Sequence, residues 1–187
     1  MTLLDETQLG EFIDARFAEP GDQLFRMERL PLYAVPHQSS DLERWLAGET
    51  EPNWTTKQPW LDRLADEHRR GLQSRRVRRF GATLTDDEIC ACHWGYAYTG
   101  KFEDIRVLHE GEHEFPGGLI EQDYWLVDDQ HVLPMIYDEE GRFVGAEIAP
   151  PERLDEFRRD RDRAWAAAEP FFDWWGRHTE LHRPAAT

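Results

Sequence analysis

Apolar and polar residues alternate most clearly between Asp123 and Ile148, where three short apolar runs are separated by two polar turns. The turns read Asp-Asp-Gln at 128–130 and Asp-Glu-Glu-Gly at 138–141, compositions that are typical of hairpin connections. This pattern predicts a three-stranded antiparallel meander. The acids are ordinary turn residues and lack the interleaved spacing of a calcium-binding loop, so we expect them to be structural.

Elsewhere, apolar residues recur at helical spacing in five segments with capping or stop residues at their ends. The expected helices cover about 5–18, 40–48, 59–71, 85–100 and 151–168. Three further alternating segments, at 24–28, 75–80 and 104–108, are expected to be strands, the first at a sheet edge. The element order predicts an α+β fold, with a small antiparallel sheet of about five strands, a C-terminal meander and packing helices. We expect a single domain over 1–175 and a frayed polar tail over 176–187.

The segment Arg75–Phe80 contains four arginines, which strand alternation divides between two faces. Arg76 and Arg78 share one face, and Arg106 on a neighbouring strand is expected to complete a three-arginine site for a carboxylate or phosphate. Two structural alternatives remain open. The charges protect a sheet edge, or they pair with the many acids of the chain.

Net charge narrows the classes of partner. The 187 residues include 22 Lys and Arg against 38 Asp and Glu, a formal net charge of −16. This balance disfavours direct binding to nucleic acid or anionic lipid and suits a soluble protein or one that docks to a basic partner. The beginning of the chain has no basic, apolar signal pattern, and no stretch is long and apolar enough for a membrane span, so we expect a cytoplasmic protein.

The Cys90-Ala-Cys92-His93 segment is the most metal-like motif of the sequence. On a helix, residues two apart point to nearly opposite faces, so both cysteines cannot serve one site without distortion. His109, His113 and His131 are the other histidines considered as ligands for such a site. We expect no metal, and the cysteines to pack as small apolar residues. No phosphate loop, dinucleotide fingerprint or nucleophile elbow is present, and we expect no cofactor.

Aromatic residues are plentiful, with eight Trp and ten Phe. Most are expected to be core, because each buries a large apolar area. Tyr124 and Trp125 alternate, so one should face the core while the other lines a groove. Trp174 and Trp175 are adjacent and are expected to form a partner or self-association surface.

The sequence also resembles an actinobacterial domain-of-unknown-function family, from about residue 11 to about residue 172. The segments that carry the resemblance are Phe25–Glu28, Tyr33–Val35, Arg44–Glu49, Pro59–Leu61, Arg76–Arg78, Glu103–Arg106, Asp123–Asp128 and Tyr137–Glu147. The resemblance implies a standalone cytoplasmic protein, often encoded near helix-turn-helix regulators or in specialised-metabolite clusters, and no activity. The chain departs from the family pattern at 83–87, at Ala91 and at Phe102, so the lining of any pocket beside the helix from Thr85 is altered.

Together these observations favour a non-catalytic binding or regulatory companion that acts through an arginine-containing pocket or an acidic surface. The expected ligand-binding residues are Arg76, Arg78, Arg106 and Trp125, and the expected partner is a small acidic metabolite or a basic protein such as a helix-turn-helix regulator. The alternative is a small enzyme of specialised metabolism acting on a polar, acid-bearing metabolite. Its candidates for proton transfer are His93, Asp128 and Tyr137. Convergence of these groups in one concave pocket would favour a ligand binder or an enzyme.

Overall fold

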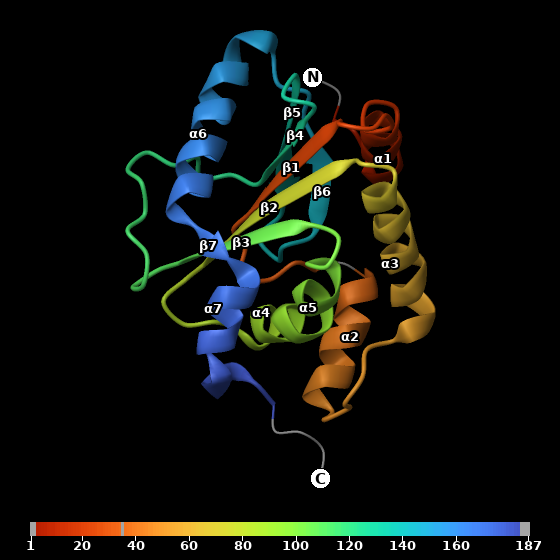
Figure 1. Ribbon diagram of the computed structural model, residues 1–187, viewed down its shortest axis with the longest axis vertical. Helices are drawn as coiled ribbons and strands as arrows, with labels where there is room; N and C mark the ends of the chain where they lie inside the picture. The colour runs from red at the N-terminus through yellow and green to blue at the C-terminus, as the bar shows by residue number, and fades with distance from the viewer. Residues whose placement is uncertain (1–2, 35, 184–187) are drawn as a thin grey trace.

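The computed structural model describes residues 3–34 and 36–183, with only the backbone of 36–40 (Figure 1). Within these residues seven strands form one mixed sheet in the order β6-β5-β4-β1-β2-β3-β7. The strands are β1 (Gln23–Glu28), β2 (Gln73–Phe80), β3 (Asp104–His109), β4 (Tyr124–Val127), β5 (His131–Tyr137), β6 (Phe143–Ala146) and β7 (Glu169–Pro170). The α+β class is confirmed, but the prediction of an antiparallel sheet of about five strands is wrong.

The difference comes from the first three strands, which run parallel to one another. Helical crossovers link β1 to β2 and β2 to β3, and such crossovers return the chain in the same direction. The meander β4-β5-β6 is antiparallel, as its turns predict, and it pairs with β1 through β4. Consequently β1 and β2 are central strands, and the prediction that residues 24–28 form an edge strand is wrong.

The helices begin and end largely where caps predict. They are α1 (Glu6–Asp14), α2 (Pro36–Leu46), α3 (Trp54–Arg69), α4 (Asp86–Ala91), the π-helical segment Cys92–Tyr96, α5 (Ala97–Thr99), α6 (Leu154–Ala167) and α7 (Phe171–Arg177). Asp5 and Thr85 cap α1 and α4 through reciprocal capping boxes. Two starts differ from prediction. Asn53 caps α3, which places Pro59 inside the helix, and α2 begins at Pro36, ahead of the expected Ser40.

Two faces of the sheet carry different cores, and in Figure 1 α6 lies on the opposite side of the sheet from α1 and α3. Phe25, Met27, Val77 and Tyr124 of the sheet share one cluster with Phe157 of α6, and this cluster is almost wholly apolar. On the other face, sheet residues belong to two separate apolar clusters, while Trp45, Cys90 and Trp94 form a third among the helices. One contains α1 residues with Leu24, and the other contains Phe80 with α7 residues. Between these clusters lie the polar positions of β1 and β2.

The C-terminal segment packs back onto the sheet. Trp174 is fully buried and Trp175 nearly so, in the cluster that contains Phe80 and Val107. These tryptophans are therefore not available as the self-association surface predicted from their adjacency, because α7 directs both toward the core. Arg183 lies over the Trp45 ring, 3.3 Å from its centroid. A frayed tail was expected over 176–187. Its residues 176 and 177 belong to α7, and Thr179–Leu181 form a 3-10 turn. Residues 184–187 lie outside the described part of the chain.

In the described part of the chain, none of the helices combines the length and the apolar character that crossing a membrane requires.

Candidate functional site

A cavity of about 630 Å³ opens on the sheet face that carries α1 and α3. Its wall is built from the side chains of β1 and β2, the helices α1, α3 and α4, the π-helical segment and the β5–β6 hairpin. The cavity thus lies where the polar middle of the sheet separates the two apolar clusters. Its volume is within the range of pockets that bind small molecules.

Four arginines line this cavity, and three of them, Arg26, Arg76 and Arg78, do so because of strand alternation and register. Arg26 of β1 is the register neighbour of Arg76 of β2, and Glu28 is the neighbour of Arg78. All four side chains therefore point to the same face, at adjacent positions of two central strands. Arg78 is 1% exposed, so its guanidinium belongs to the interior of the site. The convergence of Arg76 and Arg78 in a cavity, with Arg26 as a third, removes edge protection as the explanation of the charged strand.

Buried carboxylates balance these arginines, as the second structural alternative expected. Glu28 lies 2.9 Å from both Arg26 and Arg76, at separate oxygens. Glu103 approaches the far side of Arg76 at 3.0 Å, and Glu88 accepts a 2.9 Å hydrogen bond from Arg78. Glu88 is also the capping-box partner of Thr85, so the start of α4 fixes the position of Arg78.

The network shifts the pKa values of its carboxyl groups in opposite directions. Burial alone would raise the pKa of Glu28, but Arg26, Arg76 and Arg78 outweigh it and lower this pKa to about 2. For Glu103 the effect of burial dominates over attraction to Arg76, and its pKa is raised. Glu28 is therefore a fixed negative charge at neutral pH and is unsuited to act as a general base.

Arg78 retains donor capacity beside the cavity. Its Nη2 donates to the Leu30 carbonyl at 2.6 Å and to Glu88 at 2.9 Å. Its Nε and Nη1 are buried, and no described residue accepts a hydrogen bond from them. Buried guanidinium donors without partners are costly. Both atoms lack accessible surface, so an anionic ligand would satisfy them after a small movement of the Arg78 side chain toward the cavity.

Aromatic rings form much of the remaining wall. The rings that line the cavity are Tyr33, Trp60, Trp94, Tyr96, Trp125, Tyr137 and Phe143. The Arg26 guanidinium lies over Trp125, 4.8 Å from the ring centroid. Tyr96 donates a 3.0 Å hydrogen bond to Glu28, and Tyr33 donates to Asp123. The prediction that one of Tyr124 and Trp125 faces the core and the other lines a groove is confirmed. Tyr124 is buried under α6, while Trp125 lines the cavity.

The structure brings together four of the residues selected from sequence: Arg76, Arg78, Trp125 and Tyr137. Arg106 is not among them. It is the register partner of Val77, so its side chain is on the opposite face, over Trp165 at 4.3 Å and donating to the Trp165 carbonyl. The prediction that Arg106 completes a three-arginine site is therefore wrong, and Arg26 occupies the third position.

Two of the three proton-transfer candidates also lie elsewhere. His93 is outside the lining and contacts the C-terminal segment through the Leu181 carbonyl, at 3.2 Å. Asp128 occupies the β4–β5 turn with a positive φ of 47°, as a turn former does. Tyr137 does line the cavity, but burial raises its pKa to about 12, which leaves it a hydrogen-bond donor at neutral pH.

Both cysteines are free and buried. Cys90 packs beside Trp45 and Trp94, whereas Cys92 belongs to the cluster of Phe80, as expected for residues on different helix faces. Cys90 lines the cavity, but burial raises the pKa of its thiol to about 12, so it is not activated as a nucleophile.

Sequence reasoning missed several residues of the site. Arg26 and Glu28 alternate with Phe25 and Met27 in the first strand. In a central strand this alternation places the two charged side chains on the same buried face, so the pattern could have indicated them. Lys57 of α3 also lines the cavity, 3.0 Å from Asp41. It lies between the helices predicted at 40–48 and 59–71, so no predicted element placed its side chain.

Fold and site together define an α+β protein with an arginine-lined, aromatic-walled cavity on a mixed sheet. The chain belongs to the family described as domain of unknown function (DUF6879), whose sequence model matches residues 11–176. The resemblance to a family of unknown function is thereby confirmed. A comparison with curated proteins gives no significant match.

Proposed function

We propose that the protein binds a small, acid-bearing molecule with a planar apolar body in the cavity of Arg26, Arg76 and Arg78. The observation that carries this proposal is the convergence of three guanidinium groups from β1 and β2 on one cavity of a chain whose net charge is −16. Carboxylates or phosphates are the groups that guanidinium forks recognise. The rings of Trp125, Trp94 and Tyr137 would hold the planar part of such a ligand.

Binding is favoured over catalysis by the chemistry of the lining. Glu28 is held ionised by its arginines, and the thiol of Cys90 and the phenol of Tyr137 are held protonated. A general base or nucleophile that works at neutral pH needs a pKa near that pH or an activating neighbour. The proposed role is that of a cytoplasmic binding or regulatory companion, and a basic protein partner of the acidic chain remains a prediction.

A thermal-shift screen with matched pairs of ligands tests the proposal. Each pair contains an aromatic carboxylic or phosphoric acid and its neutral amide or alcohol, and the hits are then titrated by calorimetry. The acids, and not their neutral counterparts, are expected to stabilise the protein. Mass spectrometry of the ligand after incubation should recover it unchanged, whereas conversion to a product would support the enzyme alternative.

Two arginine variants provide the matched comparison. Arg26→Gln removes one cavity donor, while Glu28 keeps its contact with Arg76, so the fold should persist. Loss of one charged hydrogen bond is expected to weaken binding by roughly 10-fold or more. Arg106→Gln removes an arginine from the opposite face and should leave affinity unchanged. Equal losses in the two variants, or preference for the neutral ligands, would refute the proposal.

A further inference from the structure

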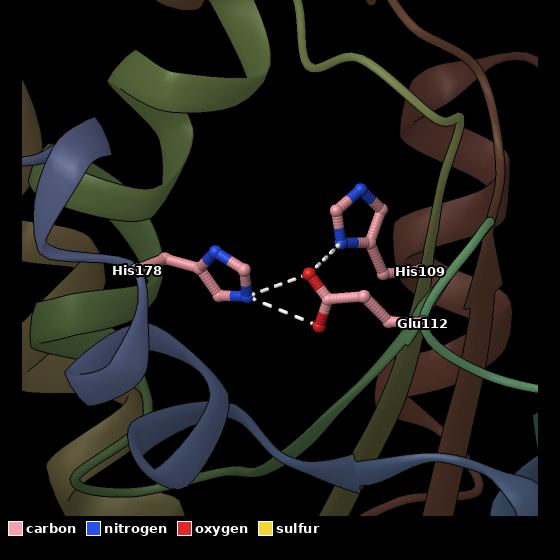
Figure 2. A group of neighbouring side chains, drawn as sticks. All are labelled: His109, Glu112 and His178. Carbon is pink, nitrogen blue, oxygen red and sulfur yellow. Dashed lines mark hydrogen bonds and ion pairs between the residues drawn. The ribbon is translucent and has the colours of Figure 1, made fainter.

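A second group of potential ligands lies outside the cavity, where the end of β3 meets the end of α7. His109 is the last residue of β3, Glu112 is in the loop that follows, and His178 is the residue after α7. One side-chain atom from each lies within 4.8 Å of the other two. Figure 2 shows both imidazoles pointing toward the Glu112 carboxylate, which lies between them.

The distances are close to those of a metal site. Glu112 Oε1 is 3.1 Å from His109 Nδ1 and 2.9 Å from His178 Nε2. In a tetrahedral zinc site with bonds of about 2.1 Å, ligand atoms are separated by about 3.4 Å. These two contacts would open by a few tenths of an ångström around an ion, and the two imidazole nitrogens, which lie within 4.8 Å of each other, would adjust to the same separation.

The environment of His109 provides an independent indication of a ligand. The residue is 8% exposed, yet neither ring nitrogen forms a hydrogen bond with a described residue. The Nδ1 atom is near Glu112 Oε1 without the alignment of a hydrogen bond. Buried polar atoms are normally satisfied, and a metal ion would accept the Nδ1 lone pair that is directed at this point.

His178 is oriented in the manner of a metal-bound histidine. Its Nδ1 lies 2.7 Å from Glu180 Oε1, and its Nε2 lies 2.9 and 3.1 Å from the two oxygens of Glu112. In the tautomer with the proton on Nδ1, Glu180 accepts that proton and the Nε2 lone pair is left for an ion at the Glu112 carboxylate. A carboxylate behind a histidine ligand commonly fixes the tautomer and raises ligand basicity. The Trp174 ring packs against both imidazoles, with centroids 4.6 Å from His178 and 5.6 Å from His109.

The nearest cation does not occupy the site. Arg177 approaches Glu112 Oε2 at 3.4 Å, but its two shorter contacts, 2.6 and 2.7 Å, go to Glu169. Glu169 also lies 3.2 Å from His113 Nε2, so His113 is directed away from the group. Glu112 Oε1, which faces both imidazoles, is thus left for an ion.

We propose that His109, Glu112 and His178 bind one divalent transition-metal ion of the zinc class. Two imidazoles and one carboxylate are a ligand set that zinc accepts, with water completing the coordination. The ion would tie the loop after β3 to the end of α7, segments that are far apart in the sequence. The proposal rests on residues separate from the arginine-lined cavity, so each stands or falls without the other.

The test uses tag-free, chelator-stripped protein, because a histidine tag would bind zinc itself. Calorimetric titration with zinc chloride is expected to give one ion per chain, and thermal unfolding should shift upward with zinc. Glu112→Gln and His178→Gln should each weaken binding by at least about 10-fold. His131→Gln, which changes a histidine at the start of β5, is the matched control and should bind as wild type does.

Circular dichroism confirms that each variant is folded before it is titrated. Cobalt(II) bound to the unmodified protein gives a further readout, since four- or five-coordinate cobalt has far stronger visible bands than the hexaaqua ion. No saturable binding at one equivalent, a spectrum equal to that of aqueous cobalt, or unchanged zinc affinity in both ligand variants would overturn the proposal. An equal loss in His131→Gln would overturn it too.

Discussion

Glu28 links the charges of the cavity at the scale of single residues. Its carboxylate contacts Arg26 and Arg76 and accepts a hydrogen bond from Tyr96. Burial of one carboxylate is unfavourable, but burial of the two arginines without it would be more so. The low pKa of Glu28, about 2, expresses this dependence.

Replacement of Glu28 by Gln should therefore change stability in a pH-dependent way. Because the folded pKa of about 2 lies below the ordinary value of 4.5, the carboxylate stabilises the fold fully above about pH 4.5 and progressively less as pH falls toward 2. The shift corresponds to about 3 kcal/mol at neutral pH. Urea unfolding of Glu28→Gln should show this loss at pH 7 and a much smaller difference from wild type near pH 2.

Glu11→Gln provides the control, since this glutamate is exposed on α1. Its effect should stay within about 0.5 kcal/mol at each pH. A Glu28→Gln protein as stable as wild type at pH 7 would show that the network does not hold the arginines in place.

At the scale of elements, β2 shows what an amino-acid pattern can and cannot predict. Alternation correctly placed Arg76 and Arg78 on the same face, because the strand period depends only on the chain itself. Whether β2 is a central or an edge strand depends on which strands pair with it. Those strands are joined to β2 through long crossovers, so the pattern within β2 does not indicate its place in the sheet. The same limit explains the error over Arg106, whose face is set by the register of β3 against β2.

Local signals predicted the elements around the cavity better than the cavity itself. The turns of the meander and the capping box at Thr85 involve residues close in sequence, and both were correctly located. The cavity instead combines residues from α1 to the β5–β6 hairpin. His178 is still more remote from His109, in a segment predicted to be a frayed tail.

The capping box of α4 is open to a direct test. Thr85 accepts from the Glu88 amide at 3.2 Å, and Glu88 accepts from the Thr85 amide at 2.9 Å. Thr85→Ala removes the hydroxyl acceptor and should cost about 1 kcal/mol in urea unfolding. It should also weaken ligand binding in the cavity, because Glu88 positions Arg78.

Thr85→Ser keeps the capping oxygen and should recover most of the loss. If Ala and Ser are equally destabilised, the methyl group rather than the cap is responsible. If stability falls without any change in ligand affinity, Arg78 does not depend on the start of α4.

At the scale of the whole molecule, the chain is strongly acidic overall but places a group of arginines in its cavity. A chain with net charge −16 concentrates arginines at the middle of its sheet, where the two apolar clusters leave a polar gap. Anions would be repelled by the overall charge at long range and attracted only within the cavity. Added salt should therefore screen the long-range repulsion between the chain and an anionic ligand more than it weakens the ligand's contacts inside the cavity.

The C-terminal segment completes the molecule, since α7 closes the cluster of Phe80 and Val107. Deletion of everything after Pro170 would remove Phe171, Trp174 and Trp175, which are 1%, 0% and 9% exposed. Truncation of one such aromatic side chain costs about 3–5 kcal/mol, so the combined loss is comparable to the total stability of a typical domain, about 5–15 kcal/mol. The shortened chain should lose its cooperative thermal transition and aggregate.

Two controls separate the core from the end of the chain. A protein ending at Arg183 keeps every described contact of the segment and should unfold as the full chain does. Phe172→Ala alters a ring that is half-exposed and should cost only about 1 kcal/mol. A chain ending at Pro170 that retains the native circular dichroism spectrum and unfolding midpoint would mean that α7 is an appendage, and that the sheet face beneath it is stable in water.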